Sequence, residues 1–106
     1  RYHTIVVALG TNGAFSPSQF NQMASVLAGV PRVVVVNVHV AKTWAAGDDV
    51  VLAQGVAAHR NQMKLMDWNT AAGGPGLLYP DGIHPNGAGS ALYARLLQQA
   101  LSTPLG

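Results

Sequence analysis

The fold class of this chain is decided by the stretch Thr4–Gly10, which reads TIVVALG. Six β-branched or apolar residues follow one another in it, and a glycine ends the run. A strand that is buried on both faces has this continuous pattern, whereas a strand with one solvent face alternates apolar and polar residues. The stretch Val33–His39 repeats the pattern, and Lys64–Asp67 is a shorter run of the same kind. The sequence therefore predicts three buried strands.

Helical patterns separate and follow these strands. Ser16–Gln19 reads SPSQ, a capping box with proline at the first helical position, and it predicts a helix that ends near Gly29. A second helix is expected from a cap at Asp48 or Asp49 to about Arg60, and a last one from about residue 87 to 101. The predicted core side of these helices carries Phe20, Met23, Leu27, Val51 or Leu52, Val56, Leu92, Leu96, Leu97, Ala100 and Leu101.

Strands alternating with helices predict a single α/β domain of three layers over residues 1–106, with a short parallel sheet of about three strands and helices on both faces. The strand at residues 4–9 is too apolar for a solvent-exposed edge. We expect it to pair with a further segment of the same domain or with another chain. The chain opens with Arg1 and not with methionine, which we interpret as a cut inside a larger protein.

The composition excludes several classes of function. The chain has 106 residues, of which 49% are hydrophobic and only 9% charged, and its formal net charge is +2. Its lysines and arginines are scattered, so it lacks the clustered positive charge of a nucleic-acid-binding surface. It has no cysteine, no apolar run long enough to span a membrane and no signal peptide. A surface with so few charges favours a domain that contacts more of its own protein, a partner or a membrane-proximal surface.

The segment Tyr79–Asn86 reads YPDGIHPN and sets Asp81 three residues before His84. A carboxylate at this distance can hold one imidazole nitrogen while the other faces a substrate or nucleophile. Pro85 disfavours a helical conformation at His84, so the imidazole is expected on a loop before the last helix. The alternative is purely structural, because the first four residues also form a good type I turn and Asn86 a good helix cap. That alternative leaves His84 unexplained.

Further polar groups are expected to meet this pair, because ligands of open α/β sheets bind outside the carboxyl ends of the strands. Gly10, Thr11, Asn12 and Gly13 follow the first strand, and His39 ends the second. The side-chain amide of Asn12 is a suitable donor to a developing oxyanion, although Asn-Gly is also an ordinary turn dipeptide. His39 either contacts substrate or is a hydrogen-bonded structural residue.

Two other kinds of site are less well supported by the same residues. A metal site built from His39, Asp81 and His84 lacks the close ligand spacing of metal centres. The stretch 10–13 matches neither the dinucleotide fingerprint nor the P-loop. We therefore expect no metal and no cofactor.

Gly10–Asn12 and Asp81–His84, taken together, resemble the third and fifth motif blocks of the SGNH (GDSL-type) hydrolase family. The chain is most similar to the SGNH domain of bacterial acyltransferase-3 type membrane acyltransferases, in the stretches Leu9–Gly13, Val38–Val40 followed by Trp44, Asp67–Asn69 and Leu78–His84. The resemblance covers nearly the whole chain. It implies a flavodoxin-like fold, a serine nucleophile, His84 as general base, Asp81 as its orienting partner, Asn12 as an oxyanion donor, and residues 10, 11, 13 and 39 near the substrate.

The same resemblance implies acyl-ester hydrolysis or O-acyl transfer to a carbohydrate or envelope glycan, on the extracytoplasmic side and tethered through a membrane domain of the parent protein. The chain departs from the family pattern in one respect. It has neither the Gly-Asp-Ser block that carries the nucleophile nor the block that supplies a glycine oxyanion donor, so it is similar to the C-terminal two-thirds of the domain. The isolated chain is therefore expected to be nearly inactive. The rival interpretation is a non-catalytic module that binds glycan or protein, and a third is a split enzyme completed by a partner chain.

Overall fold

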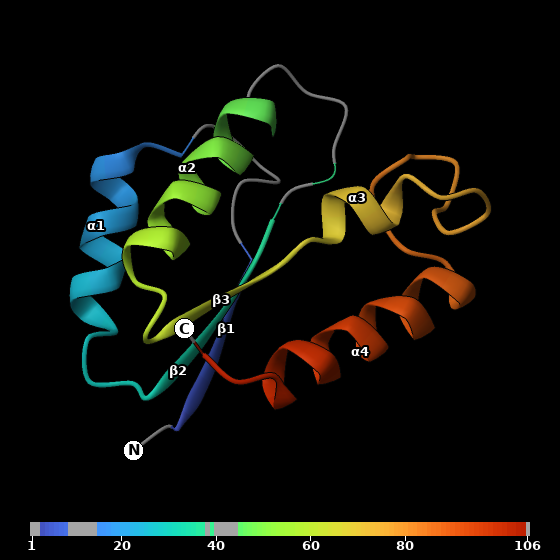
Figure 1. Ribbon diagram of the computed structural model, residues 1–106. Coiled ribbons are helices and arrows are strands. Elements are labelled where there is room, and N and C mark those ends of the chain that lie inside the picture. The colour runs from blue at the N-terminus through green and yellow to red at the C-terminus, as the bar shows by residue number, and fades with distance from the viewer. Residues whose placement is uncertain (1–2, 9–14, 38, 40–44, 106) are drawn as a thin grey trace.

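A computed structural model describes residues 3–8, 15–37, 39 and 45–105 of the chain (Figure 1). The described part contains three strands and four helices: β1 (Thr4–Ala8), α1 (Pro17–Val26), β2 (Arg32–Val36), α2 (Ala45–Ala58), β3 (Met63–Met66), α3 (Trp68–Ala72) and α4 (Gly87–Ser102). None of the helices in this described part is both long enough and apolar enough to cross a membrane.

The three strands form one parallel sheet in the order β1-β2-β3. Helices α1 and α2 lie on one face of the sheet, and α3 and α4 lie on the other (Figure 1). The predicted three-layer α/β fold with a short parallel sheet is confirmed. Parallel strands need crossover connections. Helices α1 and α2 make the two crossovers on one face, and α4, which follows the last strand, covers β2 and β3 on the other, so the central strand is buried on both faces.

The central strand β2 is the core of the molecule. Val33 and Val35 pack with Phe20 and Leu52 on the side of α1 and α2, while Val34 packs with the buried residues on the side of α4. These side chains are 2% exposed or less, so the continuous apolar run in the sequence reflects burial on both faces. The predicted core positions of α1 and α2 lie in the first cluster or against it. In α4, Ala100 is buried, but Leu101 is 39% exposed, so its predicted core position was wrong.

Strand β1 is an edge strand in the described part of the chain. Val7 packs against the cluster beneath α1 and α2, while Thr4, Val6 and Ala8 are exposed, Val6 to 42%. Helix α4 covers β2 and β3 on that face (Figure 1). One face and one edge of an apolar strand are thus free of packing from the described residues.

The start of α2 differs from its prediction. The helix begins at Ala45, and neither Asp48 nor Asp49 is its cap. Asp48 lies in the first turn, where it is 2% exposed, and its Oδ1 accepts a hydrogen bond of 2.7 Å from the backbone N–H of Phe15. A carboxylate near a helix N-terminus is stabilised by the helix dipole. Here that carboxylate holds the chain just before α1, and its Oδ2 has no hydrogen-bond partner in the described structure.

Helix α3 was not predicted from the sequence. Strand β3 ends at Met66, and Asp67 is the N-cap of the five-residue helix that follows. Trp68, its first residue, is 5% exposed, with its indole against the ring of Tyr93 in α4 and the two centroids 4.9 Å apart. Strand β2 also ends earlier than predicted, at Val36, so His39 lies beyond it.

Candidate active site

The clearest candidate for chemistry is the pair formed by Asp81 and His84. Nδ1 of His84 lies 2.6 Å from Oδ2 of Asp81. The other carboxylate oxygen accepts hydrogen bonds from the backbone N–H groups of Ile83, at 2.9 Å, and His84, at 3.1 Å. Both side chains are accessible, His84 to 74% and Asp81 to 43%. The imidazole is therefore held at one nitrogen and open to solvent over most of its surface.

The protonation of this pair follows from its hydrogen bonds. The contact with His84, together with the two backbone N–H groups, lowers the pKa of Asp81 to about 2. At neutral pH Asp81 is therefore an ionised carboxylate, which only accepts hydrogen bonds. Nδ1 of His84 must then be the donor, so the neutral imidazole carries its lone pair on Nε2. This is the tautomer that a general base needs.

A short hairpin positions the pair. The N–H of Gly82 donates to the carbonyl of Tyr79 at 2.9 Å, which confirms the predicted turn, and Gly82 has a φ of +70° that favours glycine. The N–H of Tyr79 donates in turn to the carbonyl of His84, and an antiparallel bridge joins Leu78 to Pro85. Main-chain hydrogen bonds thus fix the backbone on both sides of the imidazole.

The hairpin is anchored to the start of α4. Asn86 is the predicted N-cap, since its Oδ1 accepts from the N–H of Gly89 at 2.9 Å, and its Nδ2 donates to the carbonyl of Gly76 at 2.8 Å. Gly89 packs so closely under the hairpin that a Cβ there would lie 1.9 Å from the carbonyl oxygen of Leu77. This close approach requires glycine at position 89.

The far end of α4 determines where the hairpin lies relative to the sheet. Nη1 of Arg32, at the start of β2, donates to the carbonyls of Ala100 and Thr103, at 2.9 and 2.7 Å. The C-terminal end of α4 is therefore held at the amino end of the sheet. The helix has 16 residues, about 24 Å in length, so its N-terminus and the hairpin lie toward the carboxyl ends of the strands (Figure 1).

A second group of polar side chains lies at those carboxyl ends. Nδ2 of Asn37, just after β2, donates to Oδ1 of Asp67, just after β3, at 2.8 Å. Oδ1 of Asn37 accepts from the backbone N–H of Asn69 at 2.7 Å, and Nδ1 of His39 lies 2.8 Å from Oδ1 of Asn69. Asp67 also accepts from the N–H and the hydroxyl of Thr70. We call these five residues the β2–β3 polar network.

Only part of this network was predicted from the sequence. His39 and Asp67 were expected at the ends of the second and third strands, but Asn37 and Asn69 were not singled out. Both follow the ends of neighbouring parallel strands, the arrangement that brings side chains together, so their positions in the sequence could have identified them.

Other predicted site residues lie outside the described part of the chain. These are Gly10, Thr11, Asn12 and Gly13. The expected convergence of the Asn12 amide and the His84 imidazole therefore stays a prediction. His39 is described and half-buried, in contact with Asn69.

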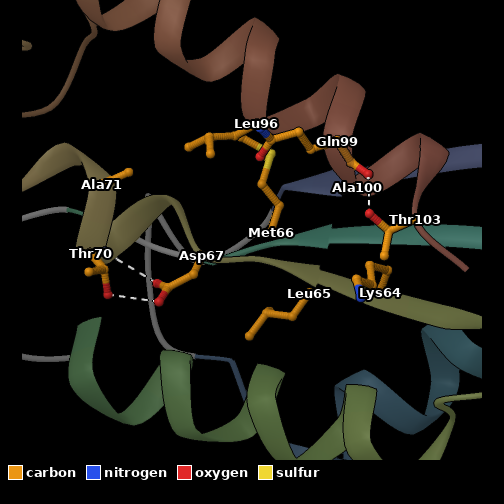
Figure 2. Close-up of a pocket in the computed structure, with 10 residues that line it drawn as sticks. All are labelled: Lys64, Leu65, Met66, Asp67, Thr70, Ala71, Leu96, Gln99, Ala100 and Thr103. Atoms are coloured by element: carbon orange, nitrogen blue, oxygen red, sulfur yellow. Dashed lines mark hydrogen bonds between the residues drawn. The ribbon is translucent and has the colours of Figure 1, made fainter. Parts of the chain in front are cut away.

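Two cavities on the α3 and α4 side of the described structure are lined by residues other than Asp81 and His84. One, of about 350 Å³, lies between β3, α3 and α4, and Figure 2 shows Asp67 and Thr70 at one end of it and Thr103 at the other. A second, of about 400 Å³, is lined by Pro85 and by Ser90, Tyr93, Ala94 and Leu97 of α4. It is mainly apolar and adjoins the residue that follows His84.

The sequence is similar to those of bacterial O-acetyltransferases. It is 32% identical over 100 residues to the O-acetyltransferase OatA of Staphylococcus aureus (strain NCTC 8325 / PS 47) and 28% identical to the peptidoglycan O-acetyltransferase OatA of Listeria monocytogenes. It is also 32% identical to YrhL of Bacillus subtilis (strain 168), whose name carries the peptidoglycan activity as a provisional assignment. The chain resembles a segment of peptidoglycan O-acetyltransferases.

The similarity covers nearly all of this chain but only a small part of each relative. The matches cover 93% of this chain but only 16% of each of these relatives, so the chain spans about one sixth of their length. No protein-family model matches the chain. The relatives from L. monocytogenes and B. subtilis are named for O-acetyl transfer to peptidoglycan, and this agrees with the acyl-transfer class and the envelope substrate expected from the sequence.

Proposed function

We propose that this chain is part of an SGNH-type domain that transfers an acyl group to peptidoglycan, with His84 as the general base and Asp81 as its orienting partner. The observation that carries the proposal is the 2.6 Å contact between His84 Nδ1 and an ionised Asp81. The similarity to O-acetyltransferases over 93% of the chain supports the reaction class.

The proposed chemistry has two steps. Nε2 of His84 takes the proton of a serine hydroxyl as its oxygen attacks the carbonyl carbon of the acyl donor. The side-chain amide of Asn12 donates to the resulting oxyanion, which collapses to an acyl-serine as the protonated His84 gives its proton to the leaving group. His84 then takes the proton of a glycan hydroxyl as its oxygen attacks the carbonyl carbon of the acyl-serine, and it returns that proton to the serine oxygen as the bond between this oxygen and the acyl group breaks. If water takes the place of the glycan, the outcome is hydrolysis.

The serine nucleophile is proposed to lie outside this chain. The chain has five serines, at positions 16, 18, 25, 90 and 102. Ser16 caps α1, and the hydroxyl of Ser102 donates to the carbonyl of Gln98. Within the described residues, no serine hydroxyl forms a hydrogen bond with His84. Any activity of the 106 residues alone should then be very low.

We propose that the serine nucleophile lies on a further strand beside β1. The exposed Val6 and the outer edge of β1, which no strand of the described residues covers, support pairing with another segment, because apolar edge strands are normally covered. We propose that this segment belongs to the same domain in a longer parent protein, which acts on the extracytoplasmic side and is tethered by a membrane domain. A partner chain along residues 4–9 is the alternative.

A fluorophosphonate probe tests the proposal, because it labels only activated serines. The full-length parent protein should be labelled, and His84→Ala should slow labelling about a hundredfold or more. His3→Ala is the matched control, since His3 is exposed at the amino end of the sheet, and it should label at the wild-type rate. A parent protein that stays folded and is never labelled would instead support the non-catalytic module. Labelling that is insensitive to His84→Ala would exclude His84 as the base.

A further inference from the structure

The β2–β3 polar network has one feature that the proposed reaction does not use. Asn37 is fixed in orientation at both ends: its Nδ2 donates to the Asp67 carboxylate and its Oδ1 accepts from the backbone N–H of Asn69. The hydrogen bonds from Asn37 and Thr70 hold the pKa of Asp67 below its usual value, so this carboxylate is ionised and accepts only. The amide of Asn37 therefore cannot be reversed without losing both bonds.

This arrangement places Asn69 beside His39. The N–H of Asn69 is bound to Asn37, and its side-chain Oδ1 lies 2.8 Å from Nδ1 of His39. A carbonyl oxygen only accepts, so Nδ1 of His39 carries the hydrogen and Nε2 of the neutral ring carries a lone pair. No hydrogen bond to Nε2 of His39 is found from the described residues.

We propose that His39 binds the acceptor glycan, with Nε2 accepting the hydrogen of a sugar hydroxyl, and that Asn69 is a positioning residue that fixes the tautomer. This inference rests on the proposed function. His39 is half-buried beyond the carboxyl end of β2, the edge where open α/β sheets bind ligands. A sugar hydroxyl is a donor that matches a preset acceptor. A protonated His39, or the other tautomer, would present a donor instead.

The role differs from that of His84. His84 is held by an ionised carboxylate, whereas His39 is held by a neutral amide, whose partial negative charge stabilises a developing positive charge less than a full negative charge does. The two contacts are of similar length, at 2.6 and 2.8 Å. The two histidines therefore differ in the chemical nature of the partner and not in the distance to it. His39 is therefore suited to binding and not to proton transfer.

The test measures acyl transfer to a peptidoglycan fragment against hydrolysis of the same donor, in the full-length parent protein. His39→Phe should raise the ratio of hydrolysis to transfer about tenfold and raise the KM for the acceptor, the effect of one lost hydrogen bond. His39→Gln, whose Oε1 can accept at the position of Nε2, should restore much of the transfer. His3→Phe serves as the control and should leave the ratio unchanged.

Two variants of Asn69 test the tautomer at about pH 8, where an imidazole of ordinary pKa is neutral. Asn69→Asp keeps an acceptor for Nδ1–H and should keep the ratio near that of the wild type, whereas Asn69→Leu should behave as His39→Phe does. An unchanged ratio in His39→Phe, or equal defects in Asn69→Asp and Asn69→Leu, would overturn the inference. These results are distinct from failure of the proposed function, in which His84→Ala would leave both transfer and hydrolysis intact.

Discussion

The Asp81 carboxylate lies 2.6 Å from His84 Nδ1 and also accepts the backbone N–H of the same histidine. One side chain thus fixes both the ring and the main chain of its partner, within a segment of four residues. Because the pair is exposed and needs no distant residue, its geometry depends on the hairpin that carries it.

Replacement of Asp81 by asparagine tests its orienting role. The amide of Asn can still accept from the N–H of Ile83, but it no longer provides a negative charge beside the imidazole. We expect Asp81→Asn to lower acyl transfer by the full-length protein about a hundredfold, with the KM for the acyl donor little changed. A loss of less than about threefold would show that Asp81 serves only the turn.

The lowered pKa of Asp81 also predicts an acid dependence of stability. A carboxylate whose pKa is lowered on folding stabilises the folded state above its unfolded pKa, and that contribution is lost as the pH falls through its folded value. For Asp81 the two values are 3.8 and about 2. The free energy of unfolding of the wild type should therefore fall from pH 4 to pH 2 more steeply than that of Asp81→Asn. Urea unfolding at several pH values measures this, and parallel curves for the two proteins would contradict it.

Gly89 is the position where the hairpin is most sensitive to substitution. A Cβ at Gly89 would meet the carbonyl oxygen of Leu77 at 1.9 Å and Cβ of Pro85 at 2.9 Å. We expect Gly89→Ala to destabilise the protein by about 1–3 kcal/mol and to lower activity by displacing the hairpin.

Gly87, two residues earlier in the same helix, is the matched control for Gly89. A Cβ at Gly87 has nothing within 4 Å, so Gly87→Ala should be neutral or stabilise by up to about 1 kcal/mol. Thermal unfolding of both variants measures the difference. Equal effects of the two substitutions would contradict the close packing at Gly89.

The cap of α4 couples the helix to the hairpin through two separate atoms of Asn86. Asn86→Ala removes the acceptor for Gly89 N–H and the donor to Gly76, and should cost about 1–2 kcal/mol. Asn86→Asp keeps the cap acceptor and loses only the donor, so it should cost less. Chemical denaturation distinguishes the two, and an equal cost would mean that the bond to Gly76 carries the whole effect.

The sequence predicted those parts of the structure that local chemistry determines. The continuous apolar run at Val33–Val36 predicted the buried central strand, and the turn at Tyr79–Gly82 with the cap at Asn86 follows from residues only a few positions apart. The Asp81–His84 contact was predicted for the same reason, because three residues of irregular backbone keep the two side chains within reach.

The parts that were missed depend on distant residues or compete with a local preference. The network from Asn37 to Asp67 and Asn69 joins residues about 30 positions apart, and only the sheet brings them together. Helix α3 has five residues, too few to produce a helical pattern in the sequence. Asp48 has the chemistry of an N-cap, but burial beside Phe15 placed it inside the first turn of α2.

The most direct test of the account is the rate of acetyl transfer to peptidoglycan by the full-length parent protein with His84→Ala, beside His3→Ala as the folded control. If His84 is the general base, the rate falls by about a thousandfold or more in His84→Ala, while His3→Ala stays within about twofold of the wild type. A folded His84→Ala protein that keeps more than about a tenth of the wild-type rate would contradict the assignment, because so small a loss is below the typical contribution of a general base.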